Sequence, residues 1–170
     1  EMYRVKNLGY KKNGKVVVNP AREPENLTNL PEFRWDIWHE RSIMGEDGVI
    51  RINVARGCPY ACSYCCNSVL IDLYHSRLLR YKPLDHVFQE INFLKKRYSP
   101  TRFSIQDDNF LLNKKAVEAF CERYTSEEIG VPFSCMARPE ALDEELVRVL
   151  RKAGCDLIGM GVECGHEEYR

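Results

Sequence analysis

Four short segments of the chain alternate apolar and polar residues with a period of two. In the first of them every second residue from Ile50 to Val54 is apolar, and Arg51 and Asn53 lie between. This alternation is typical of a β-strand that buries one face. We therefore predict strands over residues 50–55, 102–106, 132–136 and 156–162.

Three stretches between these strands have the spacing of amphipathic helices. They cover about 85–98, 113–124 and the residues between Asp143 and Gly154. Each begins at a side chain that can cap a helix, namely Asp85, Asn113 and Asp143. Strands that alternate with helices predict βαβ units, and therefore an α/β fold with a parallel sheet in sequential order. Four strands cannot close, so we expect both edges of the sheet to be unpaired or covered only by the N-terminal segment.

The first 48 residues have a different pattern. A short strand is predicted over residues 15–19, after the turn-like residues 12–14, and Pro20, Pro24 and Pro31 then favour an extended chain. Phe33, Trp35 and Trp38 suggest that this segment packs along a surface, although a solvated linker is the alternative. We divide the chain into an N-terminal segment and linker, 1–48, and a core domain, 49–170.

Composition narrows the class of protein. The 170 residues include 25 Lys and Arg and 25 Asp and Glu, so the basic excess typical of nucleic-acid-binding proteins is absent. No apolar run reaches the roughly 18 residues of a transmembrane helix, and the first ten residues lack the apolar core of a signal peptide. We therefore expect a cytoplasmic protein in a reducing compartment, where clustered cysteines indicate a metal or redox site.

Four of the eight cysteines lie between positions 58 and 66. Cys58, Cys62 and Cys65 have the spacing C-x3-C-x2-C, which lets three thiolates reach one metal centre. Iron–sulfur clusters normally take four thiolates, so three would leave one iron open. The alternative is a zinc site completed by Cys66 or by a distant residue. Cys121 and Cys135 lie at apolar positions and are predicted to be buried.

Polar residues follow the end of every predicted strand. In parallel α/β folds these ends meet at one edge, where ligands bind. The alternative for such residues is helix capping and ordinary loop polarity. The residues concerned are Cys58, Asp107, Asp108, Asn109, Arg138, Glu140 and Glu163.

Three motifs together resemble those of the radical S-adenosylmethionine (SAM) superfamily, over about residues 20–165. The first is the cysteine motif at 56–66, RGCPYACSYCC, with Tyr64 before its last ligand. The others, QDDNF at 106–110 and GMGVECG at 159–165, resemble the subgroup with an N-terminal cobalamin-binding domain, as does the linker-like segment 26–38. The resemblance implies a partial (β/α) barrel, here cut to about four parallel strands, after an extended N-terminal linker.

The resemblance also implies roles for individual residues. Cys58, Cys62 and Cys65 would ligate a [4Fe-4S] cluster, whose fourth iron would chelate the amino and carboxylate groups of SAM. Tyr64 would lie against the adenine, and Glu163 would bind the ribose or methionine portion. The loop formed by Gln106, Asp107, Asp108 and Asn109 would meet the methionine amino group. Arg138 would contact a carboxylate or a second cofactor, with an ion pair to Glu140 or Glu163 as the alternative.

The implied activity is reductive cleavage of SAM to methionine and a 5′-deoxyadenosyl radical. An external donor such as a flavodoxin or ferredoxin would supply the electron, and the radical would act on a small-molecule substrate. In the cobalamin subgroup the outcome is methyl transfer or rearrangement, with cobalamin held by a further domain. The alternatives are a radical enzyme without cobalamin, such as a methylthiotransferase, and a metal-binding module without catalysis.

Overall fold

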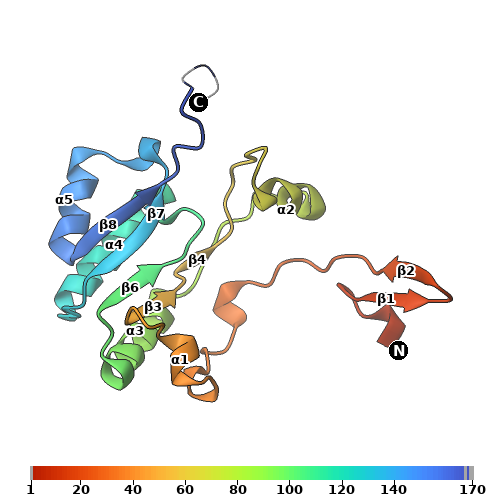
Figure 1. The fold of residues 1–170 in the computed structure, drawn as a ribbon, viewed down its shortest axis with the longest axis horizontal. Helices are drawn as coiled ribbons and strands as arrows, with labels where there is room; N and C mark the ends of the chain where they lie inside the picture. The colour runs from red at the N-terminus through yellow and green to blue at the C-terminus, as the bar shows by residue number, and fades with distance from the viewer. Residues whose placement is uncertain (1, 167, 169–170) are drawn as a thin grey trace.

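The computed structural model describes residues 2–166 and 168, and its centre is a four-stranded parallel sheet (Figure 1). The strand order is β3-β6-β7-β8, and all three neighbouring pairs are parallel. This confirms the prediction of a parallel sheet in sequential order. The strands are β3 (Val49–Ile52), β6 (Arg102–Ile105), β7 (Phe133–Ala137) and β8 (Cys155–Met160).

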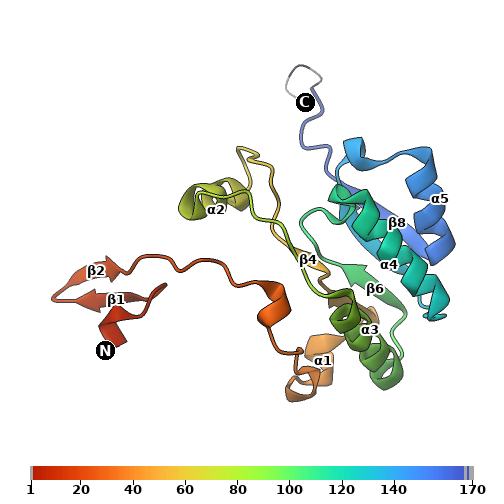
Figure 2. The ribbon, with the colours of Figure 1, turned by 180° about the vertical axis from the view of Figure 1, so that it is seen from behind.

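One face of the sheet is covered by three helices (Figure 2). They are α3 (Leu84–Tyr98), α4 (Lys114–Ser126) and α5 (Glu144–Ala153). Period-two alternation directs Phe103 and Phe133 to this side, where they are fully buried with Phe88 and Phe120. The rings of Phe120 and Phe133 meet edge to face at 5.6 Å, which is a favoured aromatic geometry. Burial of these aromatic side chains holds the helices to the strands.

The helix caps agree with the sequence at two of three starts. Asn113 and Asp143 accept hydrogen bonds from backbone N–H groups in the first turns of α4 and α5. The prediction for Asp85 was wrong, because α3 begins after Pro83 and Asp85 lies within its first turn. Gly154 ends α5 with φ +101°, a backbone conformation that glycine adopts without strain.

The first and the last predicted strands end two or more residues earlier than expected. The first ends at Ile52, and the chain then enters a separate antiparallel pair between β4 (Ala55–Arg56) and β5 (Arg80–Tyr81). The last ends at Met160, the partner of Ala137, because β7 ends there. The helix α2 (Cys66–Tyr74) was not predicted and lies in what the sequence suggested was a long loop.

The N-terminal segment contains a hairpin that extends away from the sheet (Figure 1). It joins β1 (Gly9–Lys12) to β2 (Lys15–Val18) through Asn13 and Gly14, both with positive φ, as in a type I′ turn. The short strand predicted over 15–19 is confirmed, whereas its partner was missed. The sequence then continues through short helical turns, α1 (Glu40–Ile43) among them.

The linker segment packs on the core through Trp35, whereas Phe33 and Trp38, which also suggested this packing, are exposed. Leu27 is buried, and Trp35 donates a hydrogen bond from Nε1 to Glu90 on α3 at 3.0 Å. Arg80 on β5 donates to the backbone carbonyl of Glu25 at 2.7 Å. Residues 25–35 are therefore tied to both α3 and β5. In the part of the chain that the structure describes, no helix has the length and apolar character to cross a membrane.

Candidate functional site

The cysteine loop leaves the carboxyl edge of the sheet through the β4–β5 pair. Gly57 begins the loop with φ +95°, and a Cβ atom there would lie 2.2 Å from the carbonyl oxygen of Leu78. No other residue type fits this conformation and this separation without a backbone shift. Arg77 also donates to the carbonyl of Pro59 at 2.5 Å. The residues just before β5 thus close the loop onto its own beginning.

The three motif thiols are partly buried, and Cys62 and Cys65 lie within electrostatic range of Cys58. Burial raises the pKa of Cys58, and the charges of Asp108, Cys62 and Cys65 raise it further, while a hydrogen bond from the Tyr60 backbone opposes them. All three thiols are free. Among the described residues, no three Cys, His, Asp or Glu side chains converge on a point that one metal ion could occupy.

Cys66 is in a different environment from the other cysteines of the motif. It is exposed and forms the first residue of α2, whereas Cys65 is the cap residue before it and is partly buried. The Cys65 N–H donates to the carbonyl of Cys62 at 3.0 Å, which folds the last part of the motif into a turn. The assignment of Cys66 as a non-ligand stays a prediction.

The two aspartates after β6 face different surroundings. The carboxylate of Asp107 is buried and accepts hydrogen bonds from the backbone N–H groups of Val54 and Ala55, at 2.8 and 2.9 Å. Burial raises the pKa of Asp107 to about 6, against the effect of those hydrogen bonds. Asp108 is exposed, and its charge acts on Cys58. Asp107 therefore holds the corner between β3 and β4, and Asp108 is the aspartate next to the cysteine loop.

The side-chain amides of Asn109 and Gln106 differ in their hydrogen-bond partners. Asn109 is buried, and neither its amide nitrogen nor its amide oxygen has a hydrogen-bond partner among the described residues. Gln106 donates to the hydroxyl of Ser104 at 2.7 Å, and that hydroxyl lies 3.2 Å from the hydroxyl of Ser134. These two serines, which the sequence analysis did not single out, form a polar row on the sheet face that the helices leave open.

Arg138, after β7, reaches back to the cysteine loop. Its Nη1 lies 3.7 Å from the sulfur of Cys62, and its guanidinium lies 4.3 Å from the ring centroid of Tyr60. It also forms the ion pair with Glu140, at 2.8 Å, that the sequence offered as an alternative. The ion pair and the contact with the loop coexist, because the guanidinium has several donors.

Tyr64 and Glu163 meet at the same edge. The pKa of Tyr64 is raised, first by loss of hydration and then by the charges of Glu163 and Cys62, which lie near its hydroxyl. Glu163 has φ +62°, an uncommon conformation outside glycine. The ends of β6, β7 and β8 therefore each bring one charged residue to the cysteine loop, namely Asp108, Arg138 and Glu163.

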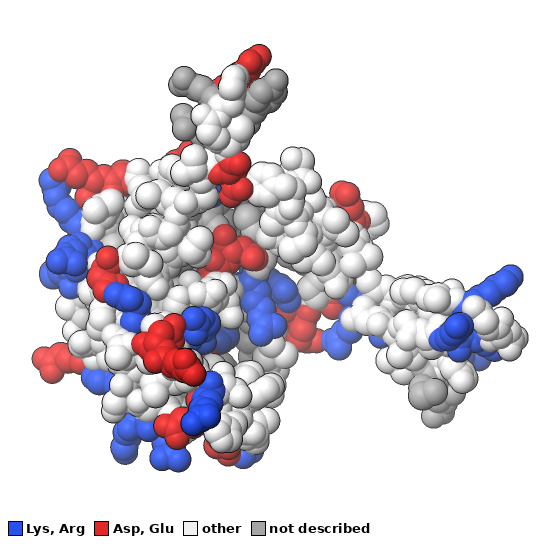
Figure 3. All heavy atoms as spheres, viewed as in Figure 1, with Lys and Arg blue, Asp and Glu red and all other residues white. Residues whose placement is uncertain are grey.

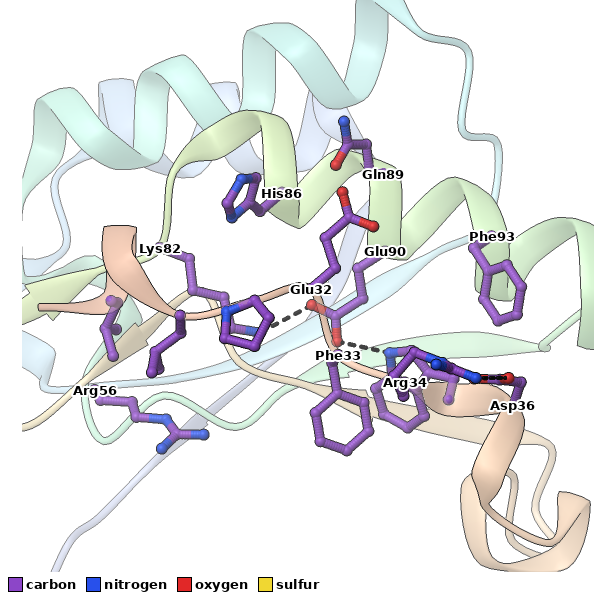
Figure 4. A pocket seen from close by; sticks show the side chains of 14 residues that line it. Glu32, Phe33, Arg34, Asp36, Arg56, Lys82, His86, Gln89, Glu90 and Phe93 are labelled. Carbon is purple, nitrogen blue, oxygen red and sulfur yellow. Dashed lines mark hydrogen bonds and ion pairs between the residues drawn. The ribbon is translucent and has the colours of Figure 1, made fainter. Parts of the chain in front are cut away.

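A hollow that was not predicted from the sequence lies between the linker segment and α3 (Figure 4). Its volume is about 500 Å³, and it is lined by Phe33, Arg56 and His86 among others. Glu90 connects the walls of the hollow, since it accepts hydrogen bonds from Trp35 and from Lys82.

Figure 3 shows Lys and Arg interspersed with Asp and Glu over the face seen in Figure 1.

Comparison with known families gives one broad match. Residues 52–170 match the family model described as the radical SAM superfamily. The match includes the cysteine loop, the last residue of β3 and the whole of strands β6, β7 and β8.

Curated relatives match most of the chain at low identity. An uncharacterized methyltransferase of Pyrococcus horikoshii is 26% identical over 96% of the chain and 35% of its own length. An anaerobic magnesium-protoporphyrin IX monomethyl ester cyclase of Rubrivivax gelatinosus is 30% identical over 89% of the chain and 27% of its own length. The bacteriochlorophyllide d C-12(1)-methyltransferase of Chlorobaculum tepidum is 26% identical over 68% of the chain and 25% of its own length. The chain thus spans about a third or less of the length of these relatives.

A solved structure shares the fold. The radical SAM methyltransferase TsrM of Kitasatospora setae superposes with a TM-score of 0.59 over 72% of this chain and 23% of its own, at 19% identity. That structure contains tryptophan and a SAM analogue, and another structure of TsrM contains cobalamin and a [4Fe-4S] cluster. The likeness supports the assignment of the four-stranded sheet as part of a radical SAM barrel.

Proposed function

The chain belongs to the radical SAM superfamily, and from that premise we propose that it binds a [4Fe-4S] cluster through Cys58, Cys62 and Cys65 and cleaves SAM reductively. The observation that carries the proposal is the position of these thiols. They lie on one loop at the carboxyl edge of the sheet, next to charged residues from the ends of three further strands. This is the edge at which parallel α/β folds bind ligands.

The residues of the loop suit a cluster that keeps one iron free of protein ligands. In a cubane cluster each thiolate binds a different iron, so the three sulfurs need not converge on one point. Cys62 and Cys65 lie close enough to Cys58 for their charges to add to the effect of burial on its pKa. Three thiolates leave one iron without a protein ligand. When bound, the cluster and SAM supply the chemistry, in which one electron cleaves the sulfonium to methionine and a 5′-deoxyadenosyl radical.

The remaining site residues have distinct proposed roles toward SAM. Tyr64 and Glu163 lie together beside Cys62, where the tyrosine would contact the adenine and the carboxylate would accept hydrogen bonds from hydroxyl or ammonium groups of SAM. The exposed carboxylate of Asp108 beside Cys58 is suited to the methionine ammonium group. The unpartnered amide of Asn109 is the further polar group of this loop that a ligand or a water would satisfy.

The structure suggests different roles for Asp107 and Gln106 from the contact with SAM that the sequence implied. Both oxygens of Asp107 are occupied by backbone N–H groups, so we propose that it shapes the loop after β3 and contacts SAM only indirectly. The amide of Gln106 is hydrogen bonded to Ser104 on the open sheet face, where it would line the space for substrate.

We further propose that the activity is methyl transfer with cobalamin as a second cofactor. Two of the relatives are named methyltransferases, and TsrM, which shares the fold, has been solved with cobalamin. Ring formation is the second candidate, because the Rubrivivax relative is a cyclase. The substrate and the electron donor, for which a flavodoxin or ferredoxin is the expected class, are parts of the same proposal.

The proposal is tested by SAM cleavage. The protein is reconstituted anaerobically with iron and sulfide, reduced with dithionite in the presence of SAM, and analysed for 5′-deoxyadenosine by chromatography. We expect product from the wild type and from Cys66→Ala, and none from Cys65→Ala. Cys66→Ala is the matched control, because it removes a neighbouring thiol outside the C-x3-C-x2-C spacing. Cleavage by Cys65→Ala, or loss of cleavage in Cys66→Ala, would contradict the ligand assignment, and no cleavage by the wild type would contradict the function.

A further inference from the structure

We propose that Arg138 is a positioning residue that raises the reduction potential of the cluster, through the contact of its guanidinium with the Cys62 sulfur. The inference rests on the proposed function, because it requires a cluster at Cys58, Cys62 and Cys65. It concerns a different property, which is how readily that cluster accepts an electron.

The contact is direct and comes from a distant part of the chain. Nη1 of Arg138 lies 3.7 Å from the sulfur of Cys62, and the two residues are 76 positions apart. A thiolate ligand at Cys62 would receive an N–H···S hydrogen bond from this donor, and hydrogen bonds to the ligand sulfurs are among the factors that set cluster potentials. The same donor carries a positive charge at every accessible pH.

Two neighbours hold the guanidinium in place. Its carbon atom lies 4.3 Å from the ring centroid of Tyr60, which is itself part of the cysteine loop. Its Nη2 is ion-paired with Glu140 at 2.8 Å. The buried Nε has no hydrogen-bond partner among the described residues, so one side of the group is shielded from water. The charge of Arg138 is therefore fixed beside Cys62 and is only partly screened by solvent.

The sign of the effect follows from the charges. Reduction adds one electron to the cluster, and in a titration that electron comes from dithionite through a low-potential dye. A fixed positive charge stabilises the more negative, reduced form, so Arg138 raises the potential. The carboxylate of Glu140 partly cancels this charge and lowers the potential. Removal of Arg138 should thus lower the potential, and removal of the Glu140 charge should raise it. A purely structural role for the pair would not produce shifts of opposite sign.

The experiment is a redox titration of the anaerobically reconstituted protein, monitored by the EPR signal of the reduced cluster. For Arg138→Gln we expect the ratio of reduced to oxidised cluster at a given solution potential to fall about tenfold, a shift of about 59 mV to lower potential for a one-electron couple. Glu140→Gln should shift the potential upward, and Arg138→Lys should keep most of the wild-type value. Arg102→Gln is the matched control, because Arg102 is also ion-paired, has the same 37% side-chain exposure and lies at the opposite end of the sheet.

The possible outcomes separate the two proposals. A wild-type protein that takes up iron and sulfide, with opposite shifts for Arg138→Gln and Glu140→Gln and none for Arg102→Gln, supports the inference. A cluster with the same potential in Arg138→Gln as in the wild type overturns the inference and leaves the proposed function intact. If Arg138→Gln does not retain a cluster, the shift of Glu140→Gln decides, and an unchanged or lower potential overturns the inference. A wild type that binds no cluster overturns both.

Discussion

Replacement of Asp107 by alanine should destabilise the fold, whereas the same change at its neighbour Asp108 should not. The carboxylate of Asp107 accepts two buried backbone hydrogen bonds, from Val54 and Ala55, and so fixes the turn that leads from β3 into the cysteine loop. Asp108 is exposed and makes no such bonds. The two residues offer a comparison of identical side chains at adjacent positions.

The magnitude follows from the groups left without a partner. Asp107→Ala removes the acceptor of two buried N–H groups, and an unsatisfied buried donor costs about 1–3 kcal/mol. Part of this loss is recovered, because the mutation also removes a carboxylate that burial disfavours. We therefore expect a loss of about 2–4 kcal/mol in the free energy of unfolding. Asp107→Asn retains one acceptor oxygen and should lose about half as much, whereas Asp108→Ala should stay within about 0.5 kcal/mol of wild type.

The pH dependence gives a second, independent readout. Burial raises the pKa of Asp107 from an ordinary value of 3.8 to about 6, so the native state holds this proton more tightly than the unfolded state does. The contribution of the group to stability is then fully present below about pH 4 and is lost as the pH rises through about 6. The destabilisation caused by Asp107→Ala should accordingly be larger at about pH 4.5 than at about pH 7.

Urea unfolding followed by circular dichroism measures both quantities. The midpoint and the slope of each transition give the free energy of unfolding for the wild type and the variants at the two pH values. The reasoning is refuted if Asp107→Ala and Asp108→Ala are equally stable. It is also refuted if the difference between Asp107→Ala and the wild type grows as the pH rises.

Two further changes test the surroundings of the site. Gly57→Ala should lower the uptake of iron by the cysteine loop and destabilise the protein by more than about 1 kcal/mol, because its φ of +95° and the 2.2 Å separation from the Leu78 oxygen exclude a Cβ; normal iron content after anaerobic reconstitution would argue against this. Trp35→Phe removes the hydrogen bond to Glu90 and should reduce the free energy of unfolding by about 1 kcal/mol, measured by urea denaturation, with an unchanged midpoint as the contrary result.

The strands could be predicted because apolar and polar residues alternate along the sequence where one face of a strand is buried. Their order could be predicted because helices separate them in the sequence. The prediction failed at Val54 and Ala55, which keep the apolar pattern but donate their N–H groups to Asp107 and not to the neighbouring strand. The helix α2 was missed because Val69 and Leu73 remain exposed, so its apolar residues mark no buried face. The missed strand β1 has one apolar side chain, Tyr10, and is held by backbone pairing with β2.

The sequence predicted which loops form the candidate site, but not which side chains of those loops face the cysteines. Parallel topology brings the residues after each strand to one edge, and this is where Asp108, Arg138 and Glu163 meet the cysteine loop. Which of two adjacent aspartates faces that loop depends on the turn after β6, and no sequence pattern encodes it. The contact of Arg138 with Cys62 likewise depends on where Tyr60 places its ring.

The central claim is that three thiolates of one loop hold a cluster with an open iron for SAM. The most direct test is the EPR spectrum of the reduced, reconstituted protein recorded with and without SAM. We expect the signal of a reduced [4Fe-4S] cluster, with g values that change when SAM is added, because SAM would occupy the iron that Cys58, Cys62 and Cys65 leave without a protein ligand. A protein that gives no cluster signal, or a signal that SAM leaves unchanged, would contradict the account.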